Sequence, residues 1–415
     1  MRRIDSPATF FLERLGDLRP RAAAISHLTS GRRPRLFQYH RAHRGGHLLT
    51  IRHFAALVAA AALACLVVQG AAAQLAPVAL NRADPPQPAL DAKAAVERAT
   101  GLALQGDAAA AVKALADPPA ADFKGKDADF RACMLKRFGS ADSQPAIQNF
   151  GDPWIDSLAT DYLTYWRQSL TKPGEREQAE RELRSRVSTL LAPSFSKDAD
   201  FDAAEDAIQG EARKRGFYVL LGRTPPLREL MLWKKTTVEQ RQVNLPEGLQ
   251  SVRVSYLDDF LLRGWSYYAT CNSRSAGGWA TEEGLFAVVP AYDSLDDETF
   301  SVNFLAHESQ HFADKKNFPN LESWELEYRA KLVELALADR SQAATLELIC
   351  ENRTESKDSP HGYADFRVVD DLTARLRIKP ADLCENQQAR GQTLRDAART
   401  VLMEDSSKRR SSAHK

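Results

Sequence analysis

Apolar residues recur at helical spacing through residues 90–191, the first part of the chain with a regular pattern. Ala-rich stretches at residues 94–99 and 108–115 are followed by an aromatic stripe made of Trp154, Ile155, Leu158, Tyr162 and Trp166. This spacing places apolar side chains on one face of each helix, so the helices should pack into a bundle. We expect a mainly helical N-terminal domain over residues 90–224. It contains no pattern of catalytic type, which leaves a scaffold or substrate-shaping role.

The pattern changes after residue 225. Residues 252–257 alternate between polar and apolar, residues 265–270 are aromatic, and residues 284–289 are apolar and precede Pro290. These segments predict a small antiparallel sheet whose last strand lies at an edge, because proline suits an edge strand. An extended peptide could pair with such an edge. From residue 298 to about 316 the pattern is helical again, so residues 225–400 predict an α+β domain, and residues 401–415 predict a disordered tail.

Charge divides the chain into two unlike parts. The full sequence of 415 residues has a net charge of +1, but residues 1–53 carry eleven Arg and only three acidic residues. The residues after this basic leader therefore carry a net negative charge. Nothing indicates a nucleic-acid-binding patch on the folded part. The leader is either a disordered extension or the result of a start codon assigned too far upstream.

An export signal follows the leader. Residues 54–68 form an uncharged apolar run, and Ala71 and Ala73 before Gln74 offer a small-residue cleavage site. Residues 54–73 therefore predict a signal peptide, residues 74–89 a Pro- and Ala-rich linker, and the mature protein a periplasmic or secreted location. An uncleaved segment, which would attach the protein to the membrane, and a lipoprotein at Cys65 are the alternatives.

The four cysteines beyond the signal are Cys133, Cys271, Cys350 and Cys384. An even number in an exported chain predicts two disulfides, with a connectivity that the sequence leaves open. Unpaired buried thiols are the alternative. None of the four has the CxxC spacing of a zinc site.

The strongest chemical signal is the HExxH motif at residues 307–311, which follows the apolar residues 302–306. On a helix, His307 and His311 lie one turn apart on one face, so both imidazoles can bind a single Zn²⁺ ion. Glu308 lies about 100° round the helix, where it can face a water molecule. The motif is typical of zinc hydrolases, and two histidines on an ordinary helix are the alternative.

A catalytic zinc site needs a third protein ligand. Asp314 and Asn317 occupy the positions where the metzincin pattern would have Gly and His or Asp, so the ligand should come from the next helix. On that helix Glu327 and Glu334 lie about 20° apart in the middle of a largely apolar arc, whereas Glu325 points away. A salt-bridge ladder of Glu327, Lys331 and Glu334 is the alternative.

Two further roles follow from the helical spacing. Lys331 or Glu334 could lie in the shell of residues around the ligands while Glu327 binds the metal. Asp314, seven residues after His307, is placed to hold the second ring nitrogen of one histidine, or is a surface residue beside Lys315.

Residues 307–311 together with Glu327 and Ala330 resemble the gluzincin metallopeptidases, in which the HExxH helix is followed by a helix carrying a glutamate ligand. The resemblance covers about residues 284–340. It implies a zincin-like fold for the domain, His307, His311 and Glu327 as zinc ligands, and Glu308 as the general base. The sequence departs from the usual E-x-x-A-D form at Lys331.

A group that stabilises the transition state is expected downstream. Ser359 and Pro360 predict the start of a helix that continues to about residue 376 and carries His361 and Tyr363 on its first turn. Either residue could hold the oxyanion, and a capping role for His361 is the alternative. The sequence thus indicates an exported zinc metallohydrolase, a peptidase acting on peptides or proteins. The alternative is a non-catalytic cell-envelope binding or scaffold protein with a structural or degenerate zinc site.

Overall fold

The computed structural model describes residues 91–140, 149–192, 201–385 and 390–413. The basic leader, the expected signal at residues 54–73 and the linker at residues 74–89 lie outside these ranges. Within the described ranges, none of the helices has the length and apolar character needed to cross a membrane.

Helices make up the described chain before the first strand. They are α1 (Ala92–Leu104), α2 (Ala108–Ala116), α3 (Gly125–Phe138), α4 (Pro153–Thr171), α5 (Arg176–Leu191) and α6 (Phe201–Lys214). Helix α4 shows why the sequence is helical here. The side chain of Asp152 accepts hydrogen bonds from the first backbone amides, and Pro153 occupies the first helical position. The expected aromatic stripe is buried, with Tyr162 and Trp166 fully enclosed.

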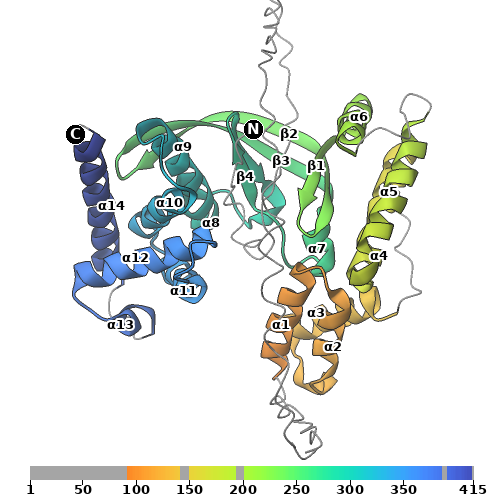
Figure 1. Ribbon diagram of the computed structural model, residues 1–415, viewed down its shortest axis with the longest axis horizontal. Coiled ribbons are helices and arrows are strands. Elements are labelled where there is room, and N and C mark those ends of the chain that lie inside the picture. The colour runs from red at the N-terminus through yellow and green to blue at the C-terminus, as the bar shows by residue number, and fades with distance from the viewer. Residues whose placement is uncertain (1–90, 141–148, 193–200, 386–389, 414–415) are drawn as a thin grey trace, which may run out of the picture. The chain divides into compact units, whose positions relative to one another are not determined.

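Five strands form one sheet in the described part of the chain. They are β1 (Tyr218–Thr224), β2 (Leu227–Leu245), β3 (Gly248–Arg263), β4 (Gly278–Thr281) and β5 (Gly284–Val288). Their order across the sheet is β1-β2-β3-β5-β4. Strands β2 and β3 are long and form a hairpin that spans the sheet (Figure 1).

The sheet differs from the expected one in two ways. It is mixed rather than antiparallel, because β5 pairs with β3 in parallel and with β4 antiparallel. The strand that precedes Pro290 is also not an edge strand, because β5 lies between β3 and β4. The proline is tolerated because it follows the last paired residue of β5, in the 3-10 turn Val289–Ala291, and so interrupts no ladder hydrogen bond.

The expected strand at residues 265–270 is instead the short helix α7 (Trp265–Ala269). Gly264, with φ +89°, turns the chain at the end of β3. The buried carboxylate of Glu229 then accepts a hydrogen bond from the backbone amide of Trp265 at 3.0 Å. Tertiary contacts with β2 therefore override the β propensity of the aromatic residues.

Helices dominate the chain after the sheet. They are α8 (Glu298–Phe300), a π-helical segment (Ser301–Ala306), α9 (His307–Asn317), α10 (Ser323–Leu337), α11 (Gln342–Asn352), α12 (Pro360–Leu376), α13 (Pro380–Cys384) and α14 (Gln392–Ala413). Ser359 caps α12 and Pro360 begins it, as the sequence predicted.

Residues 401–413 belong to α14 and not to a disordered tail, because Leu394, Ala398 and Leu402 form a buried stripe at helical spacing.

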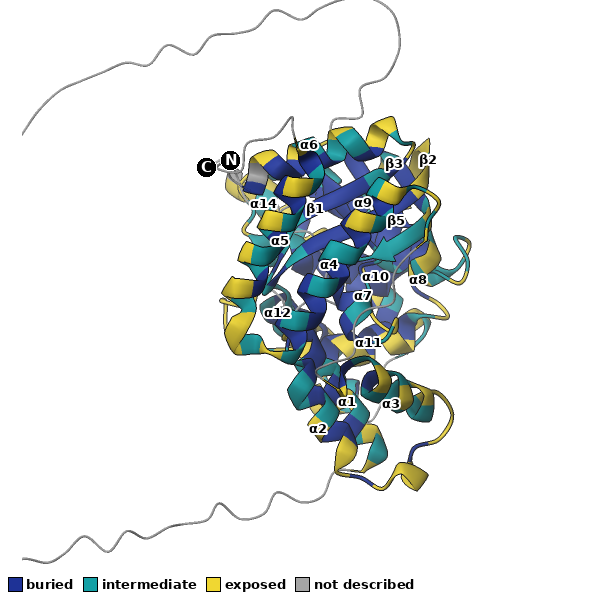
Figure 2. Ribbon diagram, turned by 90° about the vertical axis from the view of Figure 1, so that its right-hand side faces the viewer, coloured by how far each residue is buried: buried dark blue, intermediate teal, exposed yellow. Residues whose placement is uncertain are grey.

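Buried apolar residues form two clusters, and the sheet contributes to both. One joins helices α1–α6 with β1, α7 and the first half of β2, and the other joins the far half of the hairpin with the helices that follow the sheet. Figure 2 shows buried residues on the strands and the inner helix faces, with exposed residues on the outer faces. The division into domains at residue 225 remains a prediction.

Two disulfides lie within the described chain, in agreement with the expectation from the cysteine count. Cys133 of α3 pairs with Cys271, just beyond α7, and Cys350 of α11 pairs with Cys384 of α13. The first bridge fixes the helical part to the loop that follows α7, across 138 residues of sequence.

Candidate metal centre

The HExxH motif begins α9, directly after the π-helical segment. His307, Glu308 and His311 are almost fully buried, with 1%, 1% and 4% of their surfaces exposed. The rings of the two histidines lie edge to face with centroids 4.8 Å apart. One helical turn therefore brings both imidazoles to the same side of α9, as the spacing indicated.

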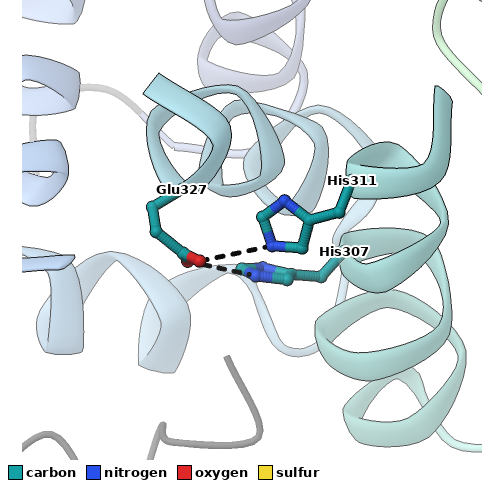
Figure 3. Close-up of side chains that lie close together, drawn as sticks. All are labelled: His307, His311 and Glu327. Atoms are coloured by element: carbon teal, nitrogen blue, oxygen red, sulfur yellow. Dashed lines mark ion pairs between the residues drawn. The ribbon is translucent and has the colours of Figure 1, made fainter. Parts of the chain in front are cut away.

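Glu327 on α10 completes a group of three side chains (Figure 3). Its carboxylate oxygens lie 3.3 Å from Nε2 of His307 and 3.3 Å from Nε2 of His311. The potential ligand atoms of the three residues all lie within 4.8 Å of one another. Glu325 points elsewhere and pairs with Arg409 of α14 at 2.9 Å.

The residues of this group fit a zinc ion. Two histidines and one carboxylate are a known ligand set of catalytic zinc, which leaves a further position for water. In the described part of the chain, both ring nitrogens of His311 are buried without a hydrogen-bond partner, as is Oε2 of Glu308. Buried polar atoms normally have partners, and a cation would supply one for His311.

Glu334, one of the two candidate ligands on α10, contacts the other nitrogen of His307. Its Oε1 lies 2.5 Å from Nδ1 of His307. The amide of Asn303 donates to Oε2 of Glu334 at 2.5 Å and to Oγ1 of Thr345 at 2.8 Å. A carboxylate that accepts the Nδ1 proton leaves Nε2 available on the side of Glu327.

The role considered for Asp314 is thus filled by Glu334. Asp314 is buried, but its carboxylate accepts hydrogen bonds from Gln310 and Arg329, each at 2.9 Å, and contacts neither histidine. Helical spacing placed Asp314 on the correct face of α9. The ring nitrogen of His307 nevertheless points toward α10, where Glu334 lies closer.

His361 joins the group from the first turn of α12. Its Nδ1 lies 3.0 Å from Oε2 of Glu327, and 15% of its side chain is exposed. Tyr363 turns away from the histidines and packs edge to face on Trp324, with centroids 4.9 Å apart. Of the two candidates for oxyanion stabilisation, the structure brings His361 to the site.

Burial and neighbouring charges set the protonation of these groups in the protein without a bound ion. Burial opposes the charged form of His307, but the carboxylates of Glu334 and Glu327 outweigh it and raise its pKa to about 10. Burial lowers the pKa of His311 to about 4 and raises that of Glu308 to about 8. Burial alone would raise the pKa of Glu327, but the neighbouring histidines outweigh it and hold the pKa well below its usual value.

Charged residues behind the site are paired more extensively than the sequence indicated. Nζ of Lys331 pairs with the buried Asp365 of α12 at 2.9 Å, a partner that lies outside the stripe of Glu327 and Glu334. Arg329 is fully buried and pairs with Asp314 of α9 at 2.9 Å, with Asp405 of α14 at 2.6 Å and with Glu247. Sequence reasoning missed Asn303, Asp365 and these partners of Arg329. The only sequence signal was the unusual number of charges on an otherwise apolar helix.

A cavity of about 410 Å³ lies beside the site. Glu308 and Asn303 line it together with Tyr292 and Phe304. Its size lies within the range of small-molecule and peptide side-chain sites. Glu308 thus lines a space large enough for part of a substrate.

Comparisons with protein-family models, with curated proteins and with solved structures found no match to this chain.

Proposed function

We propose that the protein is an exported zinc-dependent hydrolase with a gluzincin-type site in a zincin-like fold, and that it cleaves peptide bonds. The observation that carries this proposal is the buried group of His307, His311 and Glu327, whose ligand atoms lie within 4.8 Å of one another. Glu308, which follows His307 directly, lines a cavity large enough for part of a substrate.

His307, His311 and Glu327 would hold the zinc ion. When bound, zinc would polarise the scissile carbonyl and make a water molecule more acidic. The Nδ1 contact from His307 to Glu334 orients the ring, so that Nε2 faces Glu327. Asn303 in turn fixes Glu334, and the ring of His307 is thereby held before any ligand arrives.

Glu308 would serve as the general base and then as the general acid. Its carboxylate takes a proton from the attacking water and delivers it to the nitrogen of the leaving amine. Burial raises its pKa in the metal-free protein, and the positive charge of a bound zinc ion would lower it again and favour the carboxylate that acts as the base. Because Oε2 of Glu308 has no hydrogen-bond partner among the described residues, it is available to a water molecule.

His361 would stabilise the oxyanion. It lies at the edge of the buried group, in contact with Glu327 and partly open to solvent. A protonated imidazole there would donate a hydrogen bond to an oxygen on which negative charge develops.

Strand β4 supports a peptide as the substrate. It is last in the strand order, and Gly278 in this strand lines the same cavity as Glu308. An extended peptide could pair with a sheet edge there and place its scissile bond beside Glu308. A purely structural zinc site, the alternative function, would require no base, so the position of Glu308 favours catalysis.

The Glu308→Gln variant tests the proposed function. It should keep zinc, measured by metal analysis of the purified protein, and lose hydrolysis of a fluorogenic peptide library by about 10²-fold or more. His307→Ala is the matched control, which should lose the metal itself. Full activity of Glu308→Gln would refute the proposed mechanism.

A further inference from the structure

Two neighbouring cavities share part of their walls, and Glu308 lines the smaller one. The cavity of about 410 Å³ that contains Glu308 and a larger one of about 1,090 Å³ share Arg263, Tyr267, Asn272 and Pro290 in their walls. The larger cavity continues to the Cys133–Cys271 disulfide and Trp166 of the helical part. A substrate that reaches Glu308 thus has room to extend past Arg263.

Arg263 is the last residue of β3, and its charge has no counter-ion within the described chain. Its Nη2 donates to Oγ of Ser275 at 2.6 Å, and its guanidinium carbon lies 4.2 Å from the centre of the Tyr267 ring. Its Nε is buried and makes no hydrogen bond to the described residues. No described carboxylate forms an ion pair with it, although partly buried guanidinium groups usually have such a partner.

We propose that Arg263 binds a carboxylate of the substrate, so that the preferred substrates are peptides with a carboxylate close to the scissile bond. The guanidinium is flat, is held against Tyr267 and lies in the wall shared by the two cavities, where it can meet a planar carboxylate. The proposal rests on the proposed peptidase function, because it assumes that substrates enter the cavity beside Glu308.

Burial adds to the case for an anionic ligand. It lowers the pKa of Arg263, and the neighbouring Tyr267 only partly compensates. A carboxylate from the substrate would offset this cost of burial. Arg274 lines the same cavity but is exposed to solvent, which would weaken any attraction to an anion. The other wall residues include Phe304, Ala344 and Leu348, which suit an apolar neighbour of the charged group.

The carboxylate can come from an acidic side chain or from the C-terminus of a peptide, and two pairs of peptides distinguish these sources. The first pair is acetyl-Ala-Ala-Phe-Glu-Ala-amide and the same peptide with Gln in place of Glu. The second pair is acetyl-Ala-Ala-Phe-Ala-Ala with a free C-terminus and with an amide. Binding is measured by calorimetry on zinc-loaded Glu308→Gln protein, which holds each peptide without cleaving it.

We expect the charged member of at least one pair to bind about 10-fold more tightly than its neutral partner, in line with a charge-assisted hydrogen bond. Arg263→Gln, introduced into the same protein, should abolish this difference, whereas Arg274→Gln should preserve it. Equal affinities within both pairs, or loss of the difference only in Arg274→Gln, would overturn the proposal. If Arg263→Gln fails to fold, equal affinities within both pairs still overturn the proposal, and loss of the difference in Arg274→Gln does so as well.

Failure of the proposed function would look different. If the wild-type protein bound zinc but hydrolysed nothing, peptidase activity would be refuted, while the calorimetric preference for carboxylates would still be measured. If hydrolysis occurred but charged and neutral peptides bound and reacted equally, only the role of Arg263 would be refuted.

Discussion

Glu327 and Glu334 lie on one stripe of α10 but meet different atoms of the same imidazole. Glu327 approaches Nε2 of His307 at 3.3 Å, and Glu334 approaches Nδ1 at 2.5 Å. Since the two nitrogens point to opposite sides of the ring, one carboxylate can share a metal with His307 while the other fixes the ring's orientation. Two residues only about 20° apart on the helix thus take separate roles because of their different heights along it.

Replacing Glu327 should therefore affect zinc far more than replacing its near neighbour Glu325. We expect Glu327→Ala to weaken zinc binding by about 10-fold or more, at least as much as the loss of a residue that orients a ligand. Glu325→Ala should leave zinc affinity unchanged, because Glu325 pairs with Arg409 away from the site. Competition with a chromogenic chelator measures both affinities.

Glu334→Ala belongs in the same measurement. Through His307 it should lower zinc affinity, but by no more than Glu327→Ala does. A loss confined to Glu334→Ala would transfer the ligand role to Glu334. Unchanged affinity in both variants would leave the gluzincin interpretation without its third ligand.

The sequence located the residues whose positions depend on helical period alone. His307 and His311 needed only the 3.6-residue repeat and the motif spacing, whereas the repeat left Glu327 and Glu334 as alternatives and the resemblance to the gluzincins favoured Glu327. The contacts of Glu334 with His307, and of Asn303 with Glu334, depend on how α9 packs against α10, which no local pattern encodes. The same limit explains why Asp314 was considered for a role that Glu334 fills.

At the scale of elements, Arg329 joins three parts of the chain behind the metal site. It pairs with Asp314 of α9, Asp405 of α14 and Glu247 in the turn between β2 and β3. Arg329 follows Glu327 by two residues, and Asp314 follows His311 by three. The spacing between α9 and α10, and hence between the candidate ligands, is therefore fixed by a buried network of charges.

Removal of this guanidinium should be costly. We expect Arg329→Met to lower the free energy of unfolding by about 3–5 kcal/mol, because buried carboxylates lose their partner. Arg367→Met is the control, since Arg367 pairs with Asp371 on a half-exposed surface and should contribute no more than about 1 kcal/mol. Urea unfolding of both variants gives the comparison, and similar losses would contradict this account of the network.

Helices that have a clear N-terminal cap and a stripe of apolar residues could be predicted from the sequence. Elements whose conformation depends on contacts with distant residues could not. Ser359 and Pro360 marked the start of α12 correctly. By contrast, α7 forms where aromatic residues predicted a strand, because Glu229 from β2 accepts the amide of Trp265. The parallel pairing of β3 with β5 likewise depends on a connection through α7 and β4, which strand propensity does not reveal.

At the scale of the whole molecule, the paired cysteines support the export that the sequence predicts. We expect protein purified from its native host to begin near Gln74 and to contain no free thiol, because export supplies an oxidising compartment. Mass spectrometry of the N-terminus and thiol labelling under denaturing, non-reducing conditions test the two parts. Four labelled thiols would exclude the disulfides, and an intact segment at residues 54–73 would favour a membrane anchor.

The β2–β3 hairpin has a consequence for how this architecture can change in evolution. Leu227, Leu230 and Leu232 at its base are buried with the N-terminal helices, while Glu247 at its tip pairs with Arg329 beside the metal site. A fragment that began at residue 225 would expose the base of the hairpin to water and leave β2 as an unpaired sheet edge, which promotes aggregation. We therefore expect the region around the candidate metal site to keep its N-terminal helices, because their loss would expose this apolar surface.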